Sequence, residues 1–572
     1  MRLNTLKLIY IIIFVTILAR LFYWQVFRFD DLSSMAEQQH LVSAKIDAPR
    51  GLILSSDKAI LASNKPTFLV FGLPKVVKDK VGTAAKLASV FVTATLEKDE
   101  KPDPLEIKEK QQDLLSKLSQ DLSWVILNKS VDWNIKKAIE DLKIEGIGFD
   151  SQSSRFYPEA SSAAHVLGFV GSDSLGRQVG YFGVEGFYNG QLKGIGGLVT
   201  EEKDARGLPI LMGKFSLKEA RKGYNLILNI DRAVQYSVEK KLKAGFIKYG
   251  AKAASAIVMD PSTGAIIAMA SVPNYDPNLF SDFPKEYFKN SIVADAYEPG
   301  STFKVLVMAA GINENLIQPD TLCDICDGPL QISGFSIRTW NNKYNKDANM
   351  TDVIVHSDNT GMVFVGKKLG LDKMYQYIQD FGFGKSTQID LQDETSPDIR
   401  PKNDWREIDL ATSSFGQGIA VTPIQMIRAV AAIANGGKLL EPHIVKEIQE
   451  DDKNTEIKPK VISQPISKEA AQKVTEMMVK AVELGEAKVF APKGFKIAGK
   501  TGTAQIPVAG HYDANKTIAS FVGFAPADNP KFVMLVRYDE PSSSIFGAET
   551  AAPTFFEIAK ELFTYYNIAP SQ

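Results

Sequence analysis

The sequence has few of the residues that bind metals or build disulfide frameworks. It contains two cysteines and five histidines in 572 residues, which leaves little material for zinc chemistry or a disulfide scaffold. It also lacks a surplus of one charge, since 66 basic and 67 acidic residues leave a formal net charge of −1. Nucleic-acid-binding proteins normally carry a basic surplus, so this balance gives no support to such a function.

Long apolar runs are scarce as well, and a single one is long enough to span a bilayer. Residues 8–27 (LIYIIIFVTILARLFYWQVF) contain Arg20 as their one charge, and twenty helical residues measure about 30 Å. Arg2 and Lys7 precede the run, so the positive-inside rule places the short tail in the cytoplasm. No small-x-small cleavage site follows, which favours an uncleaved single-pass anchor in the plasma membrane. Arg20 either snorkels to the outer interface or contacts another membrane protein.

This placement puts the rest of the chain outside the cytoplasm, where no ATP or NADH is available. The reaction must therefore run on energy stored in its substrate. Cys323 and Cys326 could form a disulfide there or remain a reduced pair. A thioredoxin-like role needs a βαβ context that the surrounding sequence lacks, so we expect the pair to be structural or incidental.

The remaining chain has the composition of a globular protein, with 45% hydrophobic and 23% charged residues. Up to about residue 225 it is mixed, with a charged helical section over 75–142. Two strand–turn–strand patterns follow, at 254–271 and 518–540. The segment 422–435 predicts a helix that ends at Gly436, and apolar residues at helical spacing predict another helix over 554–567. Hairpins packed with helices predict an α+β domain around a mostly antiparallel sheet.

One motif points to an ATPase. Residues 494–501 (GFKIAGKT) fit the phosphate-binding pattern G-x4-G-K-[ST], and 256–260 (AIVMD) resemble the strand that ends in a magnesium-binding Asp. That motif requires a helix after the lysine. Here TGTAQIPVAG follows Lys500 and favours a strand, and Asp260 lies in a predicted hairpin. We therefore reject the nucleotide site.

A more coherent set of residues begins at Ser301. Pro299 and Gly300 break the chain, and STFKVLVMAAGI then predicts a buried helix that begins at Ser301. Ser301 and Lys304 share one face of such a helix, so the amine could take the hydroxyl proton if burial keeps it partly neutral. Such a pair is also explained by an N-cap serine with a snorkelling lysine.

Two further motifs follow in order. Ser357, Asp358 and Asn359 form an S-D-N motif, and a K-T-G motif lies at 500–503 (KTGT). The order S-x-x-K, S-D-N, K-T-G is found in penicillin-binding proteins. A nucleophile forms an acyl-enzyme, a second hydroxyl–amide pair relays protons, and a cationic strand holds a carboxylate. We expect a structural role for Asp358.

With these motifs the chain resembles a class B penicillin-binding protein. The likeness extends over nearly all of it and includes Arg50-Gly51, Arg155-x-Tyr-Pro, Gly183-x-Glu-Gly and SFGQGIAVTPIQ over 414–425. After Arg50-Gly51 the chain departs from the family's Asp-Arg-Asn-Gly-like turn. The resemblance implies an α+β protein with a transmembrane helix, a mixed pedestal and a transpeptidase domain. That domain would have a mostly antiparallel five-stranded sheet, helices on both faces and a helical subdomain. The implied boundaries are 1–7 for the cytoplasmic tail, 8–28 for the anchor, 29–225 for the pedestal and 226–568 for the transpeptidase domain.

The resemblance also implies the reaction. Ser301 would attack the D-Ala-D-Ala carbonyl of a peptidoglycan stem peptide, and an amine from a neighbouring strand would take the acyl group. Lys304 would be the base, and β-lactams would acylate Ser301; no metal or cofactor is implied. The other residues implied to act in proton transfer, substrate binding or oxyanion stabilisation are Ser357, Asn359, Lys500, Thr501, Gly502 and Thr503.

Several alternatives stay open. A septal, cell-division role is favoured over an elongation role, and a D,D-carboxypeptidase, a β-lactamase or a non-enzymatic β-lactam receptor are further readings. The family implies a separate polytopic glycan polymerase of the SEDS type and divisome proteins as partners, which would bind through the transmembrane helix and the pedestal. The acceptor amine and the oligomeric state are left undetermined.

Overall fold

The computed structural model describes residues 2–94, 101–174, 176–203, 210, 213–451, 453–508 and 511–570. The described residues form two compact units. The first consists of Met1–Arg50 and Lys193–Gly223, and the second consists of Gly51–Leu192 and Tyr224–Gln572.

The first unit contains the apolar helix and a small sheet. Residues Leu3–Phe27 form a continuous helical run, long and apolar enough to cross a membrane, with a mean hydropathy of 2.1. The predicted run over 8–27 is therefore helical, although the helix begins earlier. The Arg20 guanidinium lies 5.1 Å from the centre of the Trp24 ring. The elements are α1 (Arg2–Phe22), a π-helical turn (Tyr23–Phe27), α2 (Phe29–His40) and an antiparallel sheet of β1 (Leu41–Ile46), β8 (Gly197–Glu202) and β9 (Phe215–Lys218).

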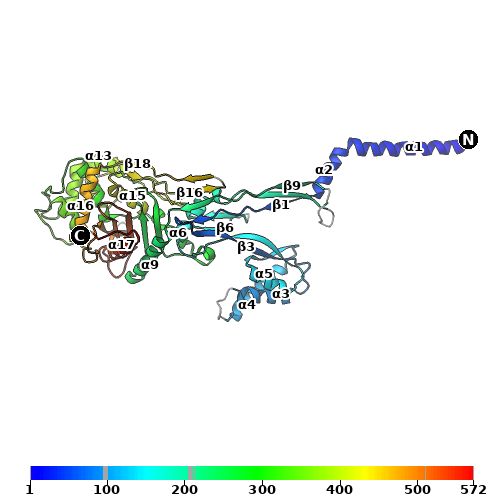
Figure 1. Cartoon of the computed structure of the whole chain (residues 1–572), viewed down its shortest axis with the longest axis horizontal. Coiled ribbons are helices and arrows are strands. Elements are labelled where there is room, and N and C mark those ends of the chain that lie inside the picture. Colours follow the sequence, from blue (N-terminus) through cyan, green and yellow to red (C-terminus); the bar gives the residue numbers. More distant parts are fainter. Residues whose placement is uncertain are drawn as a thin grey trace. The chain divides into compact units, whose positions relative to one another are not determined.

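In the second unit, a mixed sheet combines strands from both ends of the chain. Its order is β17-β16-β10-β2-β3-β4, and β5 pairs with β3. The charged section 75–142 is largely helical as predicted, and α3, α4 and α5 gather beside β3 around their own apolar cluster (Figure 1). The strands are β2 (Ile53–Leu54), β3 (Ile60–Gly72), β4 (Val125–Val131), β5 (Ile147–Phe156), β10 (Asn225–Leu228), β16 (Val445–Glu450) and β17 (Lys453–Glu456). The helices are α3 (Lys80–Thr93), α4 (Pro104–Leu118) and α5 (Trp133–Asp141).

Short elements follow β5 in the same unit. They are α6 (Ala164–Leu167), the hairpin of β6 (Phe169–Ser172) and β7 (Gln178–Tyr181), α7 (Gly183–Phe187) and α8 (Asn189–Leu192).

A five-stranded sheet with order β12-β11-β21-β20-β19 forms the centre of the second unit. All four pairings are antiparallel, and both predicted hairpins are present. The segment after Gly494 that fits the phosphate-binding pattern contains the start of a strand and no following helix, as predicted. The strands are β11 (Ala253–Met259), β12 (Ile266–Val272), β19 (Ala498–Val508), β20 (His511–Ala525) and β21 (Phe532–Asp539).

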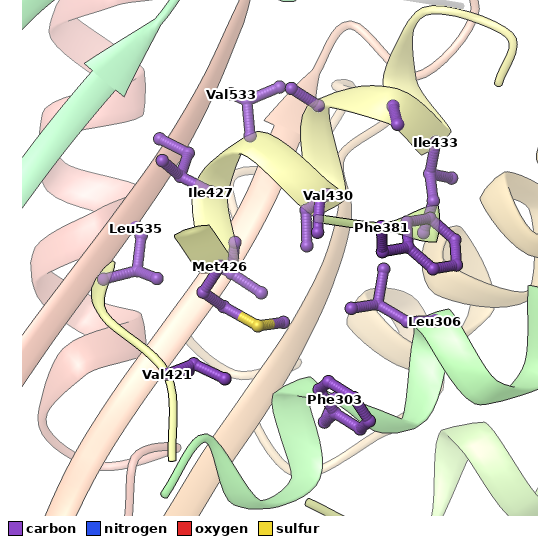
Figure 2. Packing of buried hydrophobic residues seen from close by; sticks show 14 of the residues in the cluster. Phe303, Leu306, Phe381, Val421, Met426, Ile427, Val430, Ile433, Val533 and Leu535 are labelled. Carbon is purple, nitrogen blue, oxygen red and sulfur yellow. The ribbon is translucent and has the colours of Figure 1, made fainter. Parts of the chain in front are cut away.

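Helices cover both faces of this sheet because its strands are apolar on both sides. Ala256 and Val258 pack with α9 (Arg232–Tyr249) and α17 (Ala551–Tyr565), while the alternate residue Ile257 belongs to the other core. On that second side lies α15 (Pro423–Ala434), which begins with a capping box formed by Thr422 and Gln425. Figure 2 shows residues of α15 between Leu306 and the β21 residues Val533 and Leu535.

The helical subdomain lies between the two hairpins in sequence. Cys323 and Cys326, in the loop after α11, are buried and joined by a disulfide. The helices are α10 (Ser291–Ala294), α11 (Lys304–Asn313), α12 (Met350–Val355), α13 (Asn359–Asp380), α14 (Glu407–Ser413) and α16 (Lys468–Leu484), with 3₁₀ turns at Pro277–Asp282, Lys285–Phe288, Gly300–Thr302 and Lys402–Asp404. Short strand pairs are β13 (Leu330–Ile332) with β14 (Phe335–Ile337), and β15 (Leu439–Leu440) with β18 (Val461–Ser463).

Candidate active site

Ser301 lies on a tight turn immediately before α11. The predicted helix does not begin at Ser301, because Gly300–Thr302 form a 3₁₀ turn and α11 starts at Lys304. Gly300 has a φ of 54° and its N–H donates to the Gly416 carbonyl over 3.0 Å. Ser301 is half-buried, whereas Thr302 and Lys304 are buried. The turn therefore presents the Ser301 side chain at the surface of a cavity while the following helix enters the core.

Lys304 is fully buried and holds the second motif in place. Its Nζ donates to the Asn359 Oδ1 over 2.7 Å, to the Ser357 carbonyl over 2.7 Å and to the Ser357 Oγ over 3.3 Å. Burial and the charge of Lys500 hold the pKa of Lys304 well below its usual value, and Asp358 and Glu486 partly oppose this effect. Burial therefore favours the neutral form of the Lys304 amine relative to that of a solvent-exposed lysine.

The S-D-N motif connects α12 to α13. Ser357 has a φ of 56°, a conformation that a non-glycine residue adopts only when its surroundings impose it. Asp358 caps α13 by accepting hydrogen bonds from the N–H groups of Thr360 and Gly361, which is the structural role predicted for it. The amide of Asn359 donates to the Arg338 carbonyl over 2.8 Å and thereby turns its Oδ1 toward Lys304.

The K-T-G motif lies on the edge strand β19. Lys500 is buried, and its Nζ is 3.2 Å from the Thr501 Oγ1. Burial lowers the pKa of Lys500 to about 8, against the opposing charge of Glu486. A Cβ at Gly502 would lie 2.8 Å from Thr302 Cγ2 and closer still to the Ser520 Oγ. Glycine therefore permits the strand to approach the Ser301 turn.

A cavity of about 410 Å³ brings most of the predicted residues together. Ser301, Ser357, Asn359, Thr501 and Thr503 all line it. The remaining predicted residues do not line it: Lys304 and Lys500 are buried, and Gly502 faces the turn.

Other residues in the cavity wall were missed at the level of sequence. Trp340 and Phe546 meet edge to face with ring centres 5.7 Å apart. Gln417 belongs to the 414–425 segment that contributes to the family resemblance, but that pattern assigned it no role. No motif marks Trp340, Phe546 or Glu486, because loops far apart in the sequence bring them to the cavity. The residues concerned are Trp340, Phe415, Gln417, Glu486, Gln505, Thr517, Ile545 and Phe546.

The geometry supports acyl transfer as the chemistry of this cavity. A hydroxyl faces the cavity, a buried amine contacts a second hydroxyl, and a second buried amine lies on the adjacent strand. In the described part of the chain, no group of three or more His, Cys, Asp or Glu residues is arranged to hold a metal ion.

Comparisons with known proteins match this chain to the penicillin-binding proteins. A family model described as "Penicillin binding protein transpeptidase domain" matches residues 254–560, and one described as "Penicillin-binding Protein dimerisation domain" matches 45–228. Stage V sporulation protein D of Bacillus subtilis is 33% identical over 98% of this chain and 85% of its own length. Peptidoglycan D,D-transpeptidase FtsI of Escherichia coli K12 is 28% identical over 97% of this chain and 90% of its own length.

A solved structure agrees with these matches. Penicillin Binding Protein 2X from Streptococcus thermophilus superposes with a TM-score of 0.72 at 25% identity, covering 92% of this chain and 80% of that one. The fold predicted from the resemblance is thus confirmed, including its five-stranded antiparallel sheet. The chain belongs to the class B penicillin-binding proteins and is a serine-type peptidoglycan transpeptidase.

Proposed function

We propose that Ser301 is the nucleophile that cross-links peptidoglycan stem peptides ending in D-Ala-D-Ala. Its Oγ attacks the penultimate D-Ala carbonyl, the amide bond breaks, and the terminal D-Ala leaves. An amine of a neighbouring stem peptide then takes the acyl group from the ester. The observation that carries this assignment is the contact of buried Lys304 with Ser357 and Asn359, in the wall of the cavity that Ser301 lines.

In this mechanism Lys304 is the general base. Its lowered pKa provides a neutral amine that can take the Ser301 proton. Ser357 is within 3.3 Å of the Lys304 Nζ, so it can pass the proton to the leaving amine. The amide of Asn359 holds Lys304 in place and also faces the cavity, where it can bind the substrate backbone.

The K-T-G strand holds the terminal carboxylate. Lys500 supplies positive charge behind the cavity wall, and Thr501 and Thr503 present hydroxyls in it. Gly502 permits the close approach of strand and turn that this arrangement needs. The N–H groups of Ser301 and Thr503 form the oxyanion hole, in which each donor contributes about 3–4 kcal/mol.

Labelling with a fluorescent penicillin tests the nucleophile. We expect covalent labelling of the wild-type chain and none of Ser301→Ala, because β-lactams mimic D-Ala-D-Ala and acylate the same Oγ. Ser281→Ala, at an exposed serine outside the cavity, is the matched control and should label normally. Persistent labelling of Ser301→Ala would refute the assignment.

The transpeptidase and hydrolase readings differ in their products. With a stem-peptide donor and an amine acceptor, a transpeptidase yields the cross-linked amide, whereas a carboxypeptidase yields the shortened free acid. A β-lactamase would release hydrolysed β-lactam with turnover. Mass spectrometry of the products separates these outcomes, and a receptor with an inert site would yield none of them.

The proposed organisation is a single-pass protein of the plasma membrane. Residues 1–7 lie in the cytoplasm, 8–28 anchor the chain, 29–225 form the pedestal, and 226–568 form the extracytoplasmic transpeptidase domain. The apolar helix over Leu3–Phe27 and the basic residues Arg2 and Lys7 support this topology. A SEDS-type glycan polymerase and divisome proteins are the proposed partners of the anchor and the pedestal.

The proposed biological role is septal cell-wall synthesis. The similarity to a relative named FtsI supports this role, and the similarity to one named a stage V sporulation protein supports a role in sporulation as a second candidate. Imaging of a functional fluorescent fusion decides between them. Midcell signal in dividing cells is expected, lateral-wall signal would indicate the elongation alternative, and signal confined to sporulating cells would favour the second candidate.

A further inference from the structure

A second cavity lies directly beside the catalytic one. Its volume is about 360 Å³, and it shares two wall residues, Trp340 and Glu486, with the cavity that contains Ser301. The loop over 339–348, the S-D-N turn and the end of α16 form its other walls. A ligand in this second cavity would therefore reach the acyl-enzyme past Trp340 and Glu486.

The chemistry of this second cavity suits a cationic, peptide-like ligand. Asp352, Asp358 and Glu486 contribute three carboxylates to its walls, against the single ammonium of Lys343. The hydroxyl of Tyr344 also belongs to a wall residue, is buried, and has no hydrogen-bond partner among the described residues. Such a cavity offers both carboxylates and an unused polar group to a ligand.

Glu486 is the carboxylate at the boundary of the two cavities. It is exposed, and within the described part of the chain its side chain makes no hydrogen bond or ion pair. Asp352 and Asp358, by contrast, are engaged in capping α12 and α13. Of the three carboxylates, Glu486 is therefore the one that a ligand can pair with at least cost.

Transpeptidation needs a second substrate at this location. After acylation, an amine of another stem peptide must reach the ester carbonyl, and primary amines are mostly protonated at neutral pH. We propose that Glu486 is a specificity-determining residue that binds the ammonium group of the acceptor stem peptide, and that the adjoining cavity receives that peptide. This inference rests on the proposed function of Ser301.

In the transfer step, the acyl group passes from Ser301 to the acceptor amine. Neutral Lys304 takes one proton from the ammonium, and the free amine nitrogen attacks the ester carbon. The new C–N bond forms, the C–Oγ bond to Ser301 breaks, and the second N–H proton passes to the Ser301 Oγ. Lys304 then releases its proton to water, so the enzyme returns to its starting state. Glu486 acts by raising the local concentration of the cationic acceptor.

Competition between acceptors tests this role. Full-length protein in detergent is acylated with a D-alanyl thioester donor, and D-alanine amide (cationic) is compared with hydroxylamine (uncharged at neutral pH) as acceptor. The ratio of aminolysis to hydrolysis is measured for each acceptor. For Glu486→Gln we expect transfer to D-alanine amide to fall about fivefold relative to hydroxylamine, the upper effect of a partly exposed ion pair. Glu486→Asp should retain the preference.

Glu483→Gln is the matched control, because Glu483 is an exposed carboxylate on α16 outside both cavities. It should leave the acceptor ratio unchanged. An equal loss for both acceptors in Glu486→Gln would overturn the proposal, since Glu486 would then only support the lysines, and an unchanged ratio would overturn it too. Failure of the wild type to acylate at all would instead refute the assignment of Ser301.

Discussion

At the level of single residues, the proposed mechanism requires opposite charge states of two buried lysines. In the proposed mechanism, Lys304 must lose its charge to act as a base, whereas Lys500 must keep its charge to hold a carboxylate. Burial lowers the pKa of both, and the charge of Lys500 lowers the pKa of Lys304 further. The charge of Glu486 raises the pKa of both amines and so favours their protonated forms. The two lysines therefore share one electrostatic environment, and the proposed mechanism uses one as a neutral amine and the other as a cation.

This difference predicts a bell-shaped pH profile for acylation by a carboxylate-bearing β-lactam. The rate should rise with pH as Lys304 loses its proton, because the neutral amine is the base. It should fall above about pH 8, where Lys500 becomes neutral and no longer attracts the carboxylate. The measurement is the second-order acylation rate constant as a function of pH.

Lys500→Arg provides the control, because a guanidinium keeps its charge throughout this range. Its alkaline limb should move to higher pH, whatever the change in absolute rate. An alkaline limb that stays in place in Lys500→Arg would show that another group causes it.

At the level of elements, the site depends on how closely β19 approaches the turn that carries Ser301. Gly502 faces Thr302 on that turn, and Gly300 faces Thr503 on the strand, so the strand and the turn approach each other closely at both glycines. The S-D-N connection is held from the other side by Lys304 and by the cap of Asp358. The three motifs therefore form one unit whose spacing is set by strand and helix positions.

Gly502→Ala should separate the strand from the turn. The new Cβ would come within 2.8 Å of Thr302 Cγ2, a contact that must be relieved by displacement. We expect acylation to slow by about tenfold to a hundredfold, as found when reacting groups are misplaced by about 1 Å. The measurement is the acylation rate together with the melting temperature.

Gly328→Ala is the comparison, since no atom lies within 4 Å of its added Cβ. This variant should leave the acylation rate and the melting temperature unchanged. Normal acylation of Gly502→Ala would contradict the need for close approach.

At the level of the whole second unit, early and late parts of the chain share one sheet. β2 pairs in parallel with β10, and β10 pairs with β16, which lies far downstream. A buried ion pair supports the same region: Arg155 Nε donates to Glu185 over 2.6 Å, and Arg155 Nη1 donates to the Gly51 carbonyl over 2.7 Å. Both side chains are at most 2% exposed.

Arg155→Met should destabilise the protein by about 3–5 kcal/mol, because it removes the cationic member of a buried ion pair with Glu185. Denaturant unfolding measures this change. The double variant Arg155→Met with Glu185→Leu should recover part of the loss, since no uncompensated charge remains. A double variant less stable than Arg155→Met alone would show that packing of the two side chains matters more than their charges.

Much of the fold and of the candidate site could be predicted from the sequence, because the patterns that indicate them are local. Apolar runs on both sides of a tight turn identified the hairpins, helical spacing of apolar residues identified the helix over 554–567, and the residues after Lys500 excluded a nucleotide site. The order of three short motifs indicated acyl transfer by Ser301. The start of α11 differed from its prediction because the Gly300–Gly416 hydrogen bond tightens the turn into a 3₁₀ conformation, a contact between distant residues.

Other properties depend on groups that are distant in sequence and could not be predicted from it. The pKa values of Lys304 and Lys500 depend on burial and on each other's field, which exist only once the core has formed. Trp340, Glu486 and Phe546 carry no motif and come to the cavity on separate loops. The local order of residues along the chain thus predicts which side chains take part in the chemistry. The protonation of the two lysines, the shape of the cavity and the second cavity beside Ser301 arise from tertiary packing.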